Sequence, residues 1–432
     1  MRNEPQRHTL TNDQQRAFDE IKSRILTDKG ATATLKGYAG SGKTTLLRHI
    51  VRKLGPEFNE VYMMAPTHKA AEVLGRKTGR EVMTVHSAFG LRPEWDGEGG
   101  YKFVPTGEGP KKFVWGSLLA IDEASMVTQQ LYEMIVDAQE EWNLSVIFCG
   151  DQALLPPVNE NPSPALDHDG FMLENIVRQE QDNPIIQTSM EVRESDFPKD
   201  YSFSTKTSGE QGVDVVGNRG DLIEKAIDSF DTETYRKRGD HVRILAYRND
   251  VVEKYNDICR DLLYGDTGEQ FIEGEWLVAT QPWFGVDGEK MAPVIQNSEE
   301  FVVEGKEPNS LYGFNTWVLE ISSSPEANDI RHIEVLNRDE IPRYEQKLDS
   351  LADKAKNQSG SAGWQEYYDY KEAFAHVDYS YALTTHKAQG STFTRTFVDM
   401  VDIDRCPNPK EIGRLKYVAV TRASERLVVF DG

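Results

Sequence analysis

The sequence predicts an α/β protein with two parallel sheets and two smaller insertions. Three observations support this fold class. Short apolar runs alternate with amphipathic segments in the N-terminal part, a second set of such runs begins near residue 242, and two segments interrupt the alternation. Because alternating strands and helices build parallel sheets, two sets of runs predict two domains.

The first set predicts a domain over residues 1–172. Residues 44–53 have the spacing of an amphipathic helix, and the later apolar runs end at Asp or Gly, which fits strands joined by helical crossovers. The strand-like runs are residues 33–36, 61–65, 118–121 and 145–149.

The second set predicts another domain, made of residues 173–273 and 379–432. Residues 196–221 show no clear period, so we expect a connecting loop there. The strand-like runs of this domain are residues 242–247, 396–400 and 426–430.

Two insertions interrupt these domains. Residues 90–112 are rich in Gly and Pro and predict a small β-hairpin within the first domain. Residues 274–378 begin with short β-rich runs, as in a small antiparallel barrel. They end with apolar residues at helical spacing from Tyr344 to Phe374, which predicts a helical hairpin.

Composition limits the class of protein. No run of 18 apolar residues is present, and the N-terminal residues lack the apolar stretch of a signal peptide, so we expect a cytoplasmic protein. Three widely separated cysteines indicate neither a disulfide framework nor a thiolate metal site. The formal net charge of −22 opposes binding of nucleic acid, unless a basic channel lies within an acidic shell.

Residues 37–44, GYAGSGKT, match a phosphate-binding loop between a predicted strand and a predicted helix. Glycines let backbone N–H groups surround phosphates at a helix N-terminus, Lys43 reaches the β and γ phosphates, and the Thr44 hydroxyl ligates Mg²⁺. The predicted cofactors are therefore ATP and Mg²⁺. The residues assigned to the nucleotide here are Gly37, Gly40, Ser41, Gly42, Lys43, Thr44 and Thr45.

A phosphate loop of this kind needs a carboxylate that anchors the metal. Asp122 and Glu123 follow the apolar run at residues 118–121. We assign Asp122 to the Mg²⁺ shell and Glu123 to activation of water as general base. The alternative for such a pair is a solvated turn.

Taken in order, the motifs resemble those of superfamily 1 helicases. Residues 122–126, DEASM, resemble motif II of that family. The other segments that resemble helicase motifs are residues 10–14 (Q motif), 65–71 (Ia), 84–87 (Ib), 150–158 (III), 173–178 (IV), 386–391 (V) and 417–423 (VI).

The length and the two insertions are most similar to the small phage and RecD-like helicases of subfamily 1B. This resemblance implies two RecA-like domains, a hairpin pin and an SH3-like barrel followed by helices. It also implies ATP-driven 5′ to 3′ translocation on single-stranded DNA and unwinding of DNA forks. By the same resemblance, further partners would be single-strand-binding or replication proteins, and the process would be DNA replication or recombination. The protein would be a monomer, and it would act in the host cytoplasm if it is phage-encoded.

The resemblance also implies roles for single residues. Arg178 and Arg422 would stabilise the γ-phosphoryl group during its transfer, with a surface salt bridge as the alternative for each. Gln14 would read the adenine edge. Gln152 and Gly390 are assigned to the nucleotide as well.

The DNA contacts implied by the resemblance come from motifs Ia, Ib and V. They would hold phosphates without reading bases, although each of the two histidines of motifs Ia and Ib could equally be a hydrogen-bonded core residue. The residues are Pro66, Thr67, His68, Thr84, His86 and His386.

Motif III departs from the family pattern, because Leu154 stands where the family usually has Gln. Leucine cannot donate a hydrogen bond to a phosphate. Either Gln152 takes the role of the family's Gln at the phosphate, or the coupling between ATP and DNA differs in this chain.

The hairpin insertion carries two aromatic residues, Tyr101 and Phe103. We predict that one of them, preferably Phe103, stacks on the base pair at the fork. The alternative is that both pack the hairpin against its own domain. Two rival functions also stay open. One is a P-loop ATPase switch that makes no use of DNA, and the other is a translocase that moves on nucleic acid without separating strands, or an RNA motor.

Overall fold

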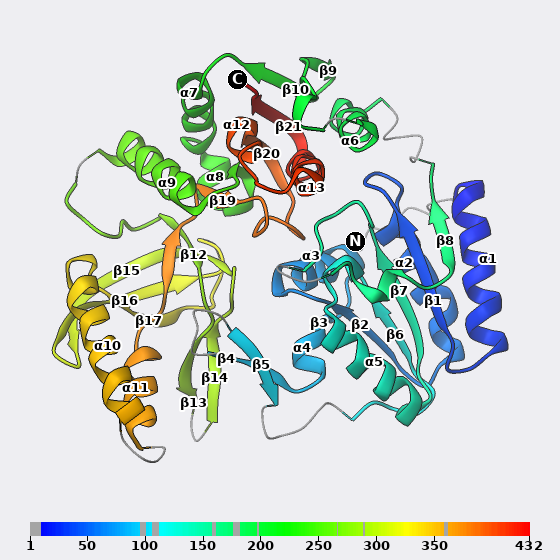
Figure 1. The fold of residues 1–432 in the computed structure, drawn as a ribbon, viewed down its shortest axis with the longest axis horizontal. Helices are drawn as coiled ribbons and strands as arrows, with labels where there is room; N and C mark the ends of the chain where they lie inside the picture. The colour runs from blue at the N-terminus through cyan, green and yellow to red at the C-terminus, as the bar shows by residue number, and fades with distance from the viewer. Residues whose placement is uncertain are drawn as a thin grey trace. The chain divides into compact units, whose positions relative to one another are not determined.

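The computed structural model describes residues 10–95, 101–105, 112–157, 161–175, 182–196, 198–265, 267–287, 290–357 and 362–432. The chain forms two compact units, which we describe separately (Figure 1). The first comprises Met1–Val215, Ala388–Thr392 and Ile403–Asp431, and the second comprises Val216–Lys387, Phe393–Asp402 and Gly432. The predicted α/β fold class is confirmed. The predicted domain boundaries remain a prediction. The compact units divide the chain differently, since residues 173–215 and 403–431 belong to the first unit.

The first unit contains a six-stranded sheet in the order β3-β2-β6-β7-β1-β8, and each neighbouring pair is parallel. Every strand-like run predicted for this domain is a strand of the sheet. The strands are β1 (Thr32–Gly37), β2 (Val61–Ala65), β3 (Met83–Thr84), β6 (Leu118–Ile121), β7 (Ser145–Gly150) and β8 (Gly170–Leu173).

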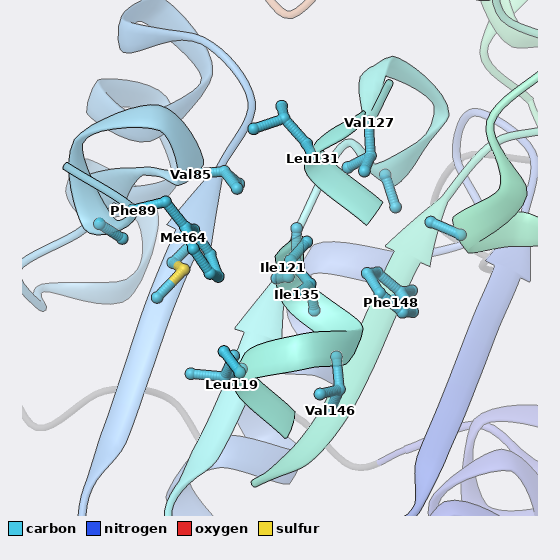
Figure 2. Packing of buried hydrophobic residues seen from close by; sticks show 14 of the residues in the cluster. Met64, Val85, Phe89, Leu119, Ile121, Val127, Leu131, Ile135, Val146 and Phe148 are labelled. Carbon is cyan, nitrogen blue, oxygen red and sulfur yellow. The ribbon is translucent and has the colours of Figure 1, made fainter. Parts of the chain in front are cut away.

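Helices cover both faces of this sheet. Alternate strand residues point to opposite faces, so β6 contributes Leu118 to one core and Leu119 to the other. One core includes apolar residues of α1 (Asn12–Thr27) and α2 (Lys43–Leu54). The other includes α5 (Gln129–Trp142) and α4 (Val85–Ala88), and Figure 2 shows Leu131 and Ile135 of α5 in the same cluster as Leu119, Ile121 and Phe148. Helix α3 spans His68–Thr78.

The predicted hairpin insertion is an antiparallel pair, β4 (Leu91–Trp95) with β5 (Tyr101–Pro105). Phe103 pairs with Pro93 in the middle of this ladder. The Tyr101 side chain lies outside the described part of the chain.

The loop expected at residues 196–221 is a wrong prediction. An antiparallel pair, β9 (Lys206–Ser208) with β10 (Gln211–Val216), lies there, and α7 (Arg219–Phe230) begins before the segment ends. Strand β9 is polar and largely exposed, so it has no apolar alternation that could reveal it. The first unit also contains α6 (Pro184–Glu194), α13 (Pro409–Thr421) and β21 (Ala423–Phe430).

In the second unit, β11 (Val242–Ala246) pairs in parallel with β19 (Ala382–Thr384) and β20 (Phe393–Asp399). The helices near these strands in sequence are α7, α8 (Glu233–Lys237), α9 (Asn249–Tyr264) and α12 (Met400–Ile403).

The larger insertion forms a five-stranded sheet in the order β17-β16-β15-β12-β18, with antiparallel neighbours. Two helices, α10 (Ile341–Asn357) and α11 (Ala362–Lys371), follow β17. Phe374 was expected on the second helix, but it follows the end of α11 and packs with Phe314 and Tyr344. The five strands of this sheet are β12 (Trp276–Ala279), β15 (Glu300–Leu311), β16 (Phe314–Ser322), β17 (Arg331–Leu336) and β18 (Val377–Tyr379). The insertion also contains a separate antiparallel pair, β13 (Trp283–Asp287) with β14 (Lys290–Ile295).

Helices with the length and hydropathy needed to cross a membrane do not occur among the described residues.

Candidate functional site

The phosphate loop connects β1 to α2 in the first unit (Figure 1). Gly40 and Gly42 have φ values of 75° and 79°, in the left-handed region that favours glycine. A Cβ atom at Gly37 would lie 2.7 Å from the Ser41 hydroxyl. A side chain at Gly40 or Gly42 would therefore be strained by the backbone conformation, and one at Gly37 would crowd Ser41. The loop leads into the first turn of α2, whose backbone N–H groups have no partner within the helix and suit an anion.

The predicted ligands of the metal lie together. The Thr44 hydroxyl donates a hydrogen bond of 3.0 Å to the Asp122 carboxylate. The Lys43 ammonium group donates to the Tyr38 carbonyl at 2.9 Å, and it lies 3.9 Å from the carboxylate of Asp151. A hydroxyl and a carboxylate oxygen are ligands that Mg²⁺ accepts beside phosphate oxygens, so this pair fits the ion.

Glu123 combines an unusual backbone with an unusual environment. Its φ of 52° is left-handed, which is uncommon for a residue other than glycine and costs on the order of 1–3 kcal/mol. Burial, and then the charge of Asp122, raise the pKa of the Glu123 carboxyl, whereas Arg422 and Lys43 lower it. A carboxylate whose pKa is raised is a stronger base once ionised, as water activation requires.

Arg422 belongs to the same cluster. It follows the last turn of α13, is 7% exposed, and donates to the backbone carbonyls of Ser391 and Val418 at 2.8 and 3.1 Å. Burial lowers the pKa of its guanidinium group, and the charge of Glu123 opposes that shift. The structure thus brings Lys43, Thr44, Asp122, Glu123 and Arg422 together. Arg178 lies outside the described residues.

Gln14 fastens α1 to the phosphate loop. Its side-chain amide donates to the Ser41 carbonyl at 3.2 Å, and its amide oxygen accepts from the Thr11 backbone N–H at 3.2 Å. The Thr11 hydroxyl in turn caps α1 by accepting from the Gln14 backbone. Its role in binding adenine stays a prediction.

The two motif III residues considered for the phosphate, Leu154 and Gln152, lie in different surroundings. Leu154 is buried. Gln152 is exposed and donates to the Leu166 carbonyl at 3.1 Å. Gln389 of motif V is buried and donates to the Leu155 carbonyl at 3.1 Å. Motif V is therefore linked directly to motif III in this unit.

Two further residues that were assigned to the nucleotide, Thr45 and Gly390, lie outside the cluster around Lys43. Thr45 is exposed on the first turn of α2. Gly390 has a φ of 83°, and a Cβ atom there would first meet Ala70 and Thr67, which belong to motif Ia. Its contacts are therefore with the predicted DNA side of the unit, and its role at the nucleotide stays a prediction.

The residues assigned to DNA in motifs Ia and Ib form a second group. Thr67 and Thr84 each cap a helix, because their hydroxyls accept from the backbone N–H groups of Ala70 and Ser87 at 3.2 and 3.1 Å. Pro66 is buried, whereas His68 is exposed at the start of α3. A cavity of about 650 Å³ lies beside α3, and its lining includes His68, Glu72, Arg76, Glu81, Thr84 and Ser87.

His86 packs against the hairpin insertion. Its ring stacks on the ring of Phe103, with centroids 3.6 Å apart and an interplanar angle of 25°. Burial lowers the pKa of His86 to about 4, so the imidazole is neutral near pH 7. Phe103 is half-buried and lies against the core shown in Figure 2. These contacts are those that the packing alternative predicts, and a role of Phe103 at the fork stays a prediction.

His386 belongs to the second unit. Its ring lies 6.0 Å from that of Tyr247, which follows β11. Both residues follow the carboxyl ends of parallel strands, β19 and β11. Loops at that edge of a parallel sheet often bind ligands.

Asp151 and Tyr417 are site residues to which the sequence assigned no role. The Tyr417 hydroxyl lies 2.7 Å from the Asp151 carboxylate and 2.9 Å from the Ala39 backbone nitrogen. Both residues lie within recognised motifs, and that position was the signal that could have revealed them. Arg193 was also missed, and its guanidinium carbon lies 3.5 Å above the ring of Tyr38. No pattern in the sequence marked Arg193.

Two family models match the chain. A model described as an AAA domain matches residues 9–209, and one described as a UvrD-like helicase C-terminal domain matches residues 379–430. Together they cover the segments that carry the nucleotide motifs and motifs V and VI. The resemblance to superfamily 1 helicases predicted from the motifs is confirmed.

Particular relatives agree with this class. The chain is 28% identical over 448 residues to the ATP-dependent DNA helicase dda of Enterobacteria phage T4, with 96% of this chain and 97% of the relative covered. It is 31% identical to the ATP-dependent RecD2 DNA helicase of Deinococcus radiodurans, over 42% of this chain and 24% of the relative. A Pif1 helicase from Bacteroides, solved in complex with ADP-AlF3 and ssDNA, matches with a TM-score of 0.50 and 18% identity, over 98% of this chain and 92% of that one. This likeness in structure supports the fold.

Proposed function

We propose that the chain is an ATP-dependent DNA helicase that moves 5′ to 3′ on single-stranded DNA and unwinds duplex DNA. The observation that carries the proposal is the convergence of Lys43, Thr44, Asp122, Glu123 and Arg422 within one compact unit. These residues supply the parts that phosphoryl transfer to water requires, namely phosphate binding, a metal anchor, a base and a positive charge. The likeness to DNA helicases over nearly the full chain supports DNA as the track.

The residues divide the chemistry among them. The loop and Lys43 hold the phosphates of ATP at the N-terminus of α2. Thr44 and Asp122 would hold Mg²⁺, which neutralises phosphate charge when bound. Glu123 orients the attacking water and accepts its proton, and Arg422 stabilises the charge that develops on the γ-phosphoryl group.

Several finer features belong to this proposal. The polarity, the action on forks and the monomeric state rest on the resemblance to subfamily 1B helicases, as do a cytoplasmic location and contacts with single-strand-binding or replication proteins. Because the chain is strongly acidic, single-stranded DNA would bind in a local basic channel, and its affinity would fall steeply with salt.

The test uses two duplexes with a single-stranded tail on either the 5′ or the 3′ side, with ATP hydrolysis followed in parallel. The proposal expects strand separation only with the 5′ tail, together with faster hydrolysis. Hydrolysis that DNA does not change would favour the ATPase switch, and stimulated hydrolysis without strand separation would favour the translocase.

A further inference from the structure

Tyr417 lies where the phosphate loop meets motif III. The residue belongs to α13 and is 1% exposed. Its hydroxyl has two partners, the Ala39 backbone nitrogen at 2.9 Å and the Asp151 carboxylate at 2.7 Å. A backbone N–H only donates and an ionised carboxylate only accepts. The hydroxyl must therefore accept from Ala39 and donate to Asp151.

The two oxygens of Asp151 are held separately. One accepts from the Ala153 backbone N–H at 2.9 Å. The other accepts from Tyr417, and the same oxygen lies 3.9 Å from the Lys43 ammonium nitrogen. Asp151 is 2% exposed, so water does little to satisfy its charge. The carboxylate oxygen that lies near Lys43 is therefore the one that accepts the hydrogen bond from Tyr417.

We propose that Tyr417 is a positioning residue for Lys43. By donating to Asp151, it keeps that carboxylate from drawing Lys43 into a closer ion pair, and the ammonium group stays available to the phosphates of a nucleotide. This inference deepens the proposed function and rests on it. It assigns to the helix of motif VI a role that is distinct from the role of Arg422.

Of the two hydrogen bonds of Tyr417, the one to the Asp151 carboxylate is expected to be stronger than the one from the Ala39 backbone. A hydrogen bond to an ionised group is roughly twice as strong as one between neutral groups. Loss of the hydroxyl would leave a buried carboxylate oxygen without its donor, and the ammonium group of Lys43, 3.9 Å away, would move toward it. Burial and the charge of Asp151 also raise the pKa of Tyr417 well above its usual value, so the hydroxyl remains a donor throughout the physiological range.

The test replaces the phenol in Tyr417→Phe and measures the Kd for N-methylanthraniloyl-ADP with Mg²⁺, as well as KM and kcat for ATP. We expect the Kd and KM to rise about tenfold, the loss typical of one charge-assisted hydrogen bond, and kcat to stay within about threefold of wild type. Tyr255→Phe is the matched control. It removes a buried phenol that donates to Asp399 at 2.8 Å in the second unit, and it should lower stability but leave the Kd unchanged.

A second substitution separates positioning from packing. Asp151→Asn in the Tyr417→Phe chain removes the charge that would hold Lys43, so the Kd should return to within about threefold of the Kd of Asp151→Asn alone. An unchanged Kd in Tyr417→Phe would overturn the inference, and so would a weaker Kd that Asp151→Asn does not restore. If the wild-type chain did not bind the nucleotide at all, the proposed function itself would be wrong.

Discussion

The phosphate site and the predicted DNA side of the first unit differ in how their side chains are used. At the phosphate site, the Thr44 hydroxyl donates to Asp122, and Lys43 lies near Asp151. Glu123 and Arg422 shift the pKa values of each other. On the DNA side, the Thr67 and Thr84 hydroxyls cap helices, and His86 stacks on Phe103.

This difference shows which kind of inference from sequence is secure. A charge, a hydroxyl and a carboxylate that meet at one point have few structural reasons to do so, because burial of charges costs free energy unless they are paired. A threonine at the start of a helix already has a structural reason, since caps stabilise helices by about 1 kcal/mol. The DNA residues therefore need experiments that separate binding from stability.

The largest expected effect is at the phosphate site. Lys43→Ala and Glu123→Gln should each lower kcat for ATP by more than about a hundredfold. Lys43→Ala removes phosphate charge and should also weaken nucleotide binding, whereas Glu123→Gln keeps the shape and should retain bound ATP. Steady-state hydrolysis and nucleotide titration measure the two effects. Lys53→Ala, on the exposed side of the same helix, is the control.

Two outcomes at this site would contradict the account. One is hydrolysis by Glu123→Gln within a few-fold of wild type. The other outcome concerns the pH dependence of hydrolysis. Because the pKa of Glu123 is raised, the base becomes protonated at a higher pH than an ordinary carboxyl would. The rate of hydrolysis should therefore begin to fall at a correspondingly higher pH. An acid limb below the usual carboxyl range would oppose the assignment.

His86 should make stability depend on pH. Its folded pKa of about 4 lies below the ordinary 6.5, so the unfolded chain binds the proton more tightly, and stability should be lost as pH falls from 6.5 toward 4. The loss attributable to His86 is about 3 kcal/mol. The measurement is the free energy of unfolding against pH for wild type and His86→Asn. The other histidines are the same in wild type and His86→Asn, so their contributions cancel in the difference between the two unfolding free energies. A difference that does not change with pH would show that His86 is not responsible.

Phe103→Ala should cost about 2 kcal/mol of stability, less than the 3–5 kcal/mol of a fully buried phenylalanine, because the ring is half-buried. If packing is its whole role, the melting temperature, DNA-stimulated hydrolysis and unwinding should all fall. If the ring also acts at the fork, unwinding should fall while stimulated hydrolysis stays nearly intact. The ratio of unwinding to hydrolysis therefore distinguishes the two readings.

The smallest expected effect comes from the helix caps. Thr67→Ala and Thr128→Ala remove the same kind of cap, since the Thr128 hydroxyl accepts from the Leu131 backbone N–H at 3.2 Å at the start of α5. Each should lower stability by about 1 kcal/mol. Only Thr67→Ala should also weaken binding of single-stranded DNA, by about threefold to tenfold. Equal DNA affinities in the two variants would show that Thr67 caps its helix and does not contribute to DNA binding.

Much of the fold could be predicted because apolar runs show buried strands directly. β2 and β6 have the predicted bounds, and both are almost fully buried. Strand β9 could not be predicted, because its residues are polar and exposed. Phe374 was placed on a helix because its spacing fits one, although a buried ring after a helix end satisfies the same pattern.

The site could be predicted where chemistry fixes residue types at short range, as in residues 37–44 and the Asp122-Glu123 pair. Tyr417 could not be assigned in this way. Its partners, Ala39 and Asp151, are more than 250 residues away in the sequence, and only the folded chain brings the three groups together. The same holds for Gln389, whose bond to the Leu155 carbonyl spans 234 positions.

The most direct test of the central claim is the rate of phosphate release from ATP with and without a single-stranded DNA oligonucleotide. The oligonucleotide should raise the rate of the wild-type chain manyfold, and high salt should remove the stimulation by weakening phosphate contacts. Glu123→Gln should release phosphate more than about a hundredfold more slowly than wild type under either condition. Release by the wild-type chain at one rate, whether or not DNA is present, would contradict the claim that this ATP site drives a motor on DNA.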